Sequence, residues 1–269
     1  EMLAGFYSMV HDRQLRIMLS VVPPEEENSR LWLKELMSAA GFDSLVLHQE
    51  LFRGFAPELS RLSMPLLLAG LLPHPTPAEE SLFRVGFDHA GGILQVVRYL
   101  AALGHTRIAY LHDSGPALGP SVRPEAFRAG LAELGLPFRD SWLATVEFAQ
   151  GAEAGRRSIH RLFSGPPPYP TAVLCASDLI AAGVIEGAEA WGRRVPDHLS
   201  VVGYGNAPWT ASFRPALTTV HQSGYELGRV LGRRILDLRD AAPDIPRVTP
   251  LPMELIVRNS TAPPRAEDS

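Results

Sequence analysis

The segment from residue 171 to residue 206 constrains the fold of this 269-residue chain more than any other stretch. It opens with five apolar residues, 172–176, that are typical of a buried strand, and Ser177 or Asp178 can then cap a helix. Apolar side chains recur along that helix at spacings of four, four and three residues. A second apolar run, residues 199–202, follows and stops at a polar tip. The segment therefore predicts one βαβ unit.

The handedness of such a unit decides where its polar residues emerge. A strand–helix–strand connection within one sheet is right-handed in nearly all proteins, so both strands point the same way. Their polar tips, at residues 177–178 and 203–206, then lie at the same edge of the sheet. Because parallel α/β sheets bind small ligands at the carboxyl ends of their strands, this edge is the predicted ligand side.

Composition excludes several classes of protein. The formal net charge is −4 without a block of like charge, which argues against a nucleic-acid surface or a membrane-binding face. No apolar run reaches the roughly 20 residues of a membrane span. The single cysteine, Cys175, falls within a predicted buried strand, so no disulfide framework is expected and a cytosolic location is favoured.

Strands and helices alternate along the whole chain, which indicates two α/β lobes. After an amphipathic helix at residues 1–11, the first series has predicted strands at 16–22, 44–47, 65–69 and 83–87, with helices near 33–41 and 57–62. The second series has strands at 107–111 and 143–148 and helices at 88–104, from 124, and at 152–163. It ends with the βαβ unit, and a further helix is expected at 224–238.

Several motifs resemble those of one bacterial family. They are residues 176–183 (ASDLIAAG), 194–204 (RVPDHLSVVGY) and 215–220 (PALTTV), preceded by 84–88 (RVGFD) and 100–109 (LAALGHTRIA) and followed by 254–261 (ELIVRNST). In this order and spacing, they are similar to the lactose-repressor (LacI/GalR) family of transcription regulators along nearly the whole chain. The resemblance implies two doubly wound parallel-sheet lobes, like periplasmic binding proteins of type I, with a ligand cleft between them.

The same resemblance implies lobe boundaries. The N-terminal lobe would comprise residues 1–88 and 222–243, the C-terminal lobe residues 89–221 and 244–261, and residues 262–269 would form a tail. The family's DNA-reading helix-turn-helix and its hinge have no counterpart in the sequence, nor does the strand that should precede Glu1. We therefore expect the chain to be a fragment of a longer regulator.

The resemblance and the strand ends together suggest a set of ligand-binding residues. Arg123 matches the family's ligand-gripping arginine, and a planar guanidinium suits paired hydroxyls or a carboxylate. Six of the residues have an ordinary structural alternative: a solvated loop arginine for Arg123, a helix cap for Ser177 and Asp88, core packing for Phe148, and a plain turn for Asn206 and Trp209. Gln222 and His48 are included because they lie at predicted strand ends that face the cleft. The full predicted set is Arg123, Phe148, Ser177, Asn206, Trp209, Asp88, Gln222 and His48.

Two glycines depart from the family pattern. Gly205 and Gly70 stand where many relatives carry an acidic residue that accepts from ligand hydroxyls. Their loss removes charge-assisted acceptors for a neutral sugar and favours an anionic or less hydroxylated ligand.

These observations predict the effector-sensing part of a LacI/GalR-type regulator of the repressor class. The partners expected are a sugar or sugar derivative, operator DNA through a domain outside this chain, and a second copy in a homodimer, with no membrane and no cofactor. Helix 224–238 and the exposed side of residues 33–37 are candidate dimer surfaces. A transporter's solute-binding protein is the first alternative. An enzyme is not favoured, because neither a nucleophile motif nor a histidine pair with metal-ligand spacing occurs.

Overall fold

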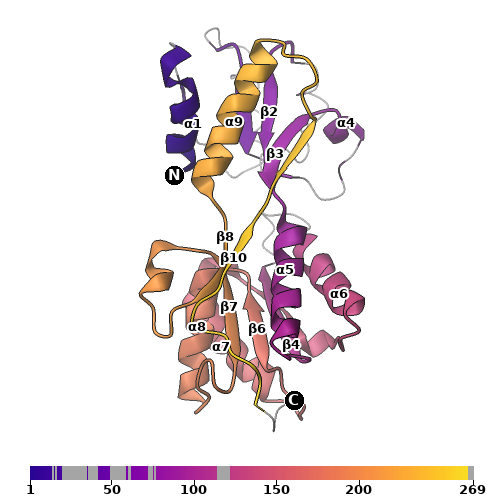
Figure 1. Cartoon of the computed structure of the whole chain (residues 1–269), viewed down its shortest axis with the longest axis vertical. Helices are drawn as coiled ribbons and strands as arrows, with labels where there is room; N and C mark the ends of the chain where they lie inside the picture. The colour runs from indigo at the N-terminus through magenta and orange to yellow at the C-terminus, as the bar shows by residue number, and fades with distance from the viewer. Residues whose placement is uncertain are drawn as a thin grey trace. The chain divides into compact units, whose positions relative to one another are not determined.

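The computed structural model describes residues 1–13, 15, 17–19, 35, 42–48, 59, 62–71, 75, 77–113 and 122–265. The chain divides into two compact units, whose segments can be followed by residue number in Figure 1. The first comprises Glu1–Phe87 and Ser223–Leu251, and the second comprises Asp88–Gln222 and Pro252–Ser269. The expected strand at 16–22 and the expected helices at 33–41 and 57–62 lie mainly outside the described residues. Among the described residues, no helix combines the length and apolarity needed to cross a bilayer.

The first unit is built on a parallel sheet with strand order β1-β2-β3-β9. Its central strand β2 buries side chains on both faces, as is typical of parallel sheets covered on both sides. One cluster contains Leu66 and Leu68, and the other contains Leu67 and Ala69. The strands are β1 (Leu45–His48), β2 (Leu66–Ala69), β3 (Phe83–Phe87) and β9 (Val248–Leu251), with a short helix α4 (Pro77–Glu80) before β3.

Helices α1 (Met2–Val10) and α9 (Gly224–Arg239) pack closely against each other in this unit. A Cβ atom on Gly5 would lie 1.9 Å from the Tyr225 carbonyl oxygen, and one on Gly228 would lie 1.9 Å from the Met2 carbonyl oxygen. Only glycine fits at these crossings. Leu231 and Ile235 of α9 then cover β2 and β3. A short 3₁₀ helix, His11–Arg13, follows α1.

The second unit contains a six-stranded sheet with order β10-β8-β7-β6-β4-β5. All neighbouring pairs are parallel except β10 with β8. Alanine, valine, leucine and cysteine fill the buried central strand β6. The strands are β4 (Ile108–Asp113), β5 (Leu143–Val146), β6 (Ala172–Cys175), β7 (Ser200–Gly205), β8 (Thr218–His221) and β10 (Glu254–Ile256).

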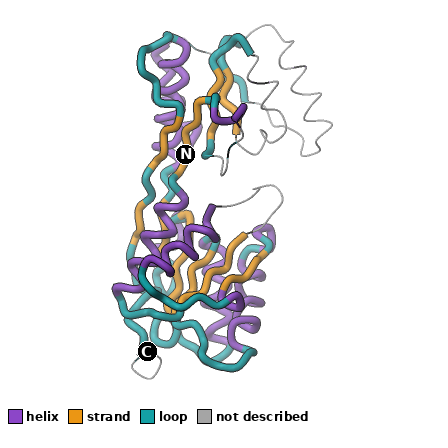
Figure 2. Tube along the Cα trace, turned by 90° about the vertical axis from the view of Figure 1, so that its right-hand side faces the viewer, coloured by secondary structure: helices purple, strands orange, loops and turns teal. Residues whose placement is uncertain are grey.

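Helices cover both faces of this sheet, as Figures 1 and 2 show. The connection through α6 runs outward from β4 to β5, whereas those through α7 and α8 run back toward β7. Right-handed crossovers in opposite directions place their helices on opposite faces. The helices are α5 (His89–Ala102), α6 (Val122–Glu133), α7 (Ala152–Phe163) and α8 (Asp178–Ala190), with 3₁₀ helices at Asp140–Trp142, Phe148–Gln150 and Pro208–Ala211.

The structure confirms the predicted α/β class with parallel sheets in two units and corrects three details. Residues 248–251, expected in the C-terminal lobe, form β9 and pair with β3, so the first unit extends to Leu251. Strand β5 ends at Val146 rather than at Phe148, which opens a 3₁₀ turn. Strand β7 continues to Gly205, beyond its expected end at residue 202.

Candidate functional site

Polar residues follow four neighbouring strands of the second sheet at their carboxyl ends. Strand β4 ends with Asp113, and Ser177 and Asp178 follow β6. Asn206 follows β7, and Gln222 follows β8. Because β4, β6, β7 and β8 are mutually parallel, these residues lie along one edge of the sheet. This is the edge at which parallel α/β sheets place their ligands.

Asp178 is the buried centre of this edge, with 4% of its surface exposed. One carboxylate oxygen accepts from the Thr219 hydroxyl at 2.5 Å, and the other accepts from the Ala207 amide at 2.7 Å. Burial raises the pKa of Asp178, while these hydrogen bonds and the charge of Arg258 act in the opposite direction. Its oxygens are engaged within the protein, so Asp178 joins α8, β8 and the loop after β7 as a structural residue.

The conformation of Gly205 is tied to the same carboxylate. Its φ is +128°, a region that favours glycine, and a Cβ there would lie 3.3 Å from Oδ2 of Asp178. The missing acidic residue noted in the sequence therefore has a local structural cause. A side chain at residue 205 would strain the backbone and approach a buried carboxylate.

Asn206 is also held within the protein. Its Oδ1 accepts from Nη2 of Arg258 at 2.8 Å, and its Nδ2 lies 3.2 Å from Nδ1 of His221. Trp209, in the next turn, is half-buried and stacks edge-on against Phe213 at a centroid distance of 5.6 Å. Both residues therefore shape the loop after β7.

A second group gathers around the buried ring of Tyr204, near the end of β7. The Arg123 guanidinium lies 4.4 Å from the centroid of this ring, within cation–π range. The Tyr204 hydroxyl lies 2.8 Å from Nδ1 of His89 and donates to Sδ of Met253 at 3.2 Å. Because the hydroxyl has one hydrogen, His89 donates from Nδ1 in this arrangement. We call Arg123, His89 and Tyr204 the Tyr204 cluster.

Burial and the charge of Arg123 set the protonation of this cluster. Desolvation, helped by the nearby guanidinium, lowers the pKa of His89 to about 3, so its imidazole is neutral at pH 7. Burial raises the pKa of Tyr204 to about 12. Burial also raises the pKa of Tyr110, on the neighbouring strand β4, and Arg123 is the main opposing influence. The cluster therefore presents one fixed positive charge beside neutral rings that form hydrogen bonds.

The structure separates the predicted ligand residues into groups. Ser177 and Asp88 cap helices: Ser177 Oγ accepts from the Ile180 amide at 3.2 Å, and Asp88 Oδ1 accepts from the Gly91 amide at 2.9 Å. Phe148 is 52% exposed after the end of β5. Gln222, the residue that follows β8, is half-buried. His48 is exposed at the end of β1 and belongs to the first unit, whereas the other seven residues belong to the second.

Sequence reasoning missed Tyr204 and His89 as members of the candidate site. Tyr204 continues an apolar strand, and His89 occupies the first turn of a helix, so neither position carries a signal of its own. The one signal that could have found them is the parallel order of the strands, because it brings the end of β7, with Tyr204, close to the start of α5, with His89. Within the described part of the chain, no group of three or more histidine, cysteine or acidic residues is placed to hold a metal ion.

Comparisons with known proteins identify the family. The model for the periplasmic binding protein-like domain matches residues 97–261. The chain belongs to this family. The expected similarity to LacI-family regulators is confirmed as well, since relatives include the HTH-type transcriptional regulator DegA of Bacillus subtilis, 33% identical over 183 residues. The HTH-type transcriptional repressor PurR of Yersinia pestis is 32% identical over 165 residues.

These matches cover different shares of the proteins. The DegA alignment spans 66% of this chain and 52% of DegA, and the PurR alignment spans 61% and 48%. The chain thus spans about half the length of these relatives. The solved transcriptional regulator CelR, in complex with cellobiose, has the same fold with a TM-score of 0.80 and 24% identity. That structural match covers 96% of this chain and 77% of CelR.

Proposed function

We propose that this chain is the ligand-sensing domain of a LacI/GalR-type transcription regulator of the repressor class. The regulator would change its operator affinity when a small sugar-like or anionic effector binds. The observation that carries the proposal is the Tyr204 cluster at the carboxyl edge of the second sheet, in a chain of this family. The regulators DegA and PurR support it from sequence, and the cellobiose-bound CelR supports a small polar ligand.

The chemistry of the edge favours acceptor groups on the ligand. Arg123 offers a guanidinium, which suits a carboxylate or a pair of sugar hydroxyl oxygens. The buried carboxylate of Asp178 is engaged by Thr219 and Ala207, and residue 205 is glycine, so carboxylate acceptors for sugar hydroxyls are reduced at this edge. A sugar acid or another effector that joins an anionic group to a compact polar ring fits this balance best.

The proposed mechanism couples the effector to DNA through a helix-turn-helix domain outside this chain. In a homodimer, effector binding would alter the spacing of two such domains, which must match operator half-sites about one helical turn or a multiple apart. Coupling of this kind typically amounts to about 1–3 kcal/mol, or about 5- to 150-fold in affinity. The regulator would act in the cytoplasm and would carry out no catalysis.

A thermal-shift screen of sugars, sugar acids and phosphates tests the proposal. An effector at 100 times its Kd should stabilise the folded domain by about 2.7 kcal/mol. Arg123→Met should remove this shift, because the guanidinium is replaced by an uncharged side chain of similar length. Arg128→Met is the matched control: Arg128 lies on the same helix α6 and contacts an aromatic ring, that of Phe138, at 5.4 Å.

The two variants separate the possible outcomes. Loss of the effector shift in Arg123→Met alone supports the assignment. An equal shift in wild type and both variants would show that the effector binds elsewhere. If a fusion to a family DNA-binding domain bound its operator with the same affinity with and without a confirmed effector, the regulatory proposal would fail.

A further inference from the structure

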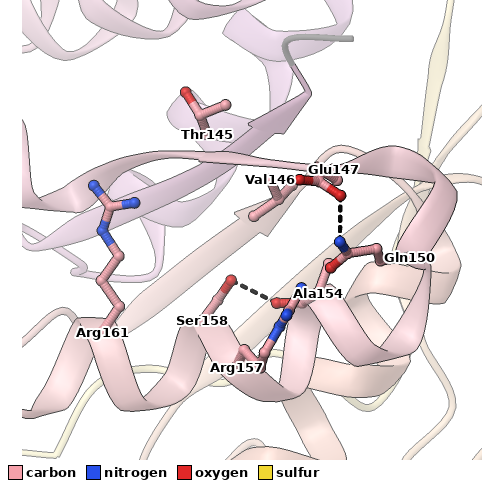
Figure 3. A pocket seen from close by; sticks show the side chains of 8 residues that line it. All are labelled: Thr145, Val146, Glu147, Gln150, Ala154, Arg157, Ser158 and Arg161. Atoms are coloured by element: carbon pink, nitrogen blue, oxygen red, sulfur yellow. Dashed lines mark hydrogen bonds between the residues drawn. The ribbon is translucent and has the colours of Figure 1, made fainter.

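A separate cavity lies in the second unit between strand β5 and helix α7. Its volume is 210 Å³, below the roughly 300–1,000 Å³ of sites for drug-sized ligands, so an occupant would be small. Figure 3 shows its lining, which comes from β5, from the turn after it and from α7. It contains none of the predicted effector residues. The lining residues are Thr145, Val146, Glu147, Gln150, Ala154, Arg157, Ser158 and Arg161.

Two arginines of α7 line this cavity and have no polar partner in the part of the chain that the structure describes. Arg157 and Arg161 are one helical turn apart on α7, and neither forms a hydrogen bond or ion pair with any described residue. Their neighbour Arg156 behaves differently, since it pairs with Glu153 at 2.9 Å and with Glu186 at 2.5 Å. Among the described residues, Arg156 is therefore paired with carboxylates, whereas the two arginines that line the cavity are not.

The turn after β5 supplies acceptors to the same cavity. Nε2 of Gln150 donates to the Glu147 carboxylate, which accepts only and so fixes the orientation of the amide. Oε1 of Gln150 is left buried with no donor among the described residues. Ser158 is already engaged, since its hydroxyl donates to the Ala154 carbonyl at 2.7 Å. A buried acceptor without a donor costs free energy and is best satisfied by a group that enters from outside.

We propose that this cavity binds a small hydroxylated anion, independently of the effector at the sheet edge. Its phosphate or carboxylate group would pair with the guanidinium groups of Arg157 and Arg161, and its hydroxyl would donate to Oε1 of Gln150. Gln150 precedes Arg157 by seven residues, and the side chains of Gln150, Arg157 and Arg161 all line the cavity. A small sugar phosphate or hydroxy acid can therefore meet the guanidinium groups with its anion and the amide oxygen with its hydroxyl.

Isothermal titration calorimetry on the whole chain in phosphate-free buffer tests the proposal. Glycerol 2-phosphate is the probe, inorganic phosphate lacks the hydroxyl, and glycerol lacks the anion. Tartrate distinguishes a carboxylate ligand from a phosphate ligand. We expect glycerol 2-phosphate or tartrate to bind several-fold more tightly than inorganic phosphate and glycerol to show no heat of binding. Amide chemical shifts of residues 145–161 should change on titration with the bound probe.

Substitutions show which side chains bind the probe. The double variant Arg157→Gln/Arg161→Gln should weaken the binding of the anionic probe at least about tenfold, because charge-assisted hydrogen bonds to an anion are among the strongest in proteins. Arg156→Gln, with a charge change on the same helix, should stay within about twofold of wild type. Gln150→Met should abolish the preference for glycerol 2-phosphate over inorganic phosphate.

The outcomes are distinct from those of the effector screen. Weaker binding in the double variant alone, with shift changes at residues 145–161, supports the cavity as an anion site. Absence of binding by wild type, or equal weakening by Arg156→Gln, overturns it. If Gln150→Met keeps the preference for the hydroxylated probe, the assignment of the hydroxyl is wrong. Loss of binding in Arg123→Met would move the anion to the sheet edge and would overturn the separate site.

Discussion

The two ends of the six-stranded sheet both carry buried polar side chains, but they use them differently. At the amino ends of the strands, His105 lies 2.9 Å from Oγ1 of Thr171 through Nδ1 and 2.9 Å from the Ala262 carbonyl oxygen through Nε2. Ser200 lies 3.1 Å from the same Nε2 and also donates to Ala262. His105, Thr171 and Ser200 are each at most 5% exposed, so this network is closed to solvent.

At the carboxyl ends, polar groups occur in two layers. Asp178 forms a buried layer whose oxygens are used within the protein. Arg123, His89 and Asp88 form an outer layer that is only partly buried and contains a fixed charge. The difference shows that a buried polar cluster is not by itself a site. A ligand site needs groups that are oriented by the protein yet still reachable from solvent.

The largest expected effect is at the closed end. His105→Ala should lower the free energy of unfolding by about 3 kcal/mol, because it leaves buried hydrogen-bonding groups unpaired and creates a cavity. Urea denaturation measures this change. His160→Ala provides the control, since that histidine is exposed on α7. The effector Kd of the folded His105→Ala protein should not change, and a large change would contradict the distinction between the two ends.

The next effect tests the departure from the family at the open end. Gly205→Asp should lower the free energy of unfolding by about 2 kcal/mol, because φ of +128° strains any side chain and the new carboxylate approaches Asp178. Gly165→Asp is the control, since a Cβ there meets nothing within 4 Å. Wild-type stability in Gly205→Asp would mean that the loop relaxes, and that glycine at this position is not structurally required.

The pH dependence of stability should have the same sign at both ends. Burial lowers the pKa of His89 to about 3 and lowers the pKa of His105 as well, so the unfolded chain binds these protons first as pH falls. The stability that comes from the neutral rings is complete above the unfolded pKa of about 6.5 and is lost progressively below it. Each histidine should contribute a slope of up to about 1.4 kcal/mol per pH unit.

Urea midpoints at pH 7, 6 and 5 measure this slope. Both His89→Asn and His105→Asn should flatten it relative to wild type. Only His89→Asn should also change the pH dependence of effector binding, since His89 is bonded to Tyr204 in the cluster. If the free energy of unfolding of both variants changed with pH as steeply as that of wild type, the fold would not be holding these rings neutral.

The sequence predicted the regular helices and strands of the second unit well. The βαβ unit at residues 171–206 and the helix at 152–163 follow from apolar periodicity, and the structure has them. Strand β9 was missed because it is an edge strand containing Pro250 with a half-exposed pattern, which proline tolerates only at an edge. At the site, strand ends could be placed from sequence. The direction of single side chains, such as Tyr204 toward Arg123, depends on packing between distant segments.

The smallest expected effect concerns the hydroxyl at the centre of the open end. Tyr204→Phe keeps the ring beneath Arg123 but removes the oxygen that lies 2.8 Å from His89 and donates to Met253. Stability should fall by only about 1 kcal/mol, the usual net value of a hydrogen bond. The effector Kd should rise several-fold, because His89 loses the partner that fixes its ring. Tyr169→Phe, at the opposite end of β6, is the control, and its effector Kd should match that of wild type. If Tyr204→Phe lowered stability as much as His105→Ala while leaving the Kd unchanged, the Tyr204 hydroxyl would belong to the framework, and the two ends of the sheet would be equivalent.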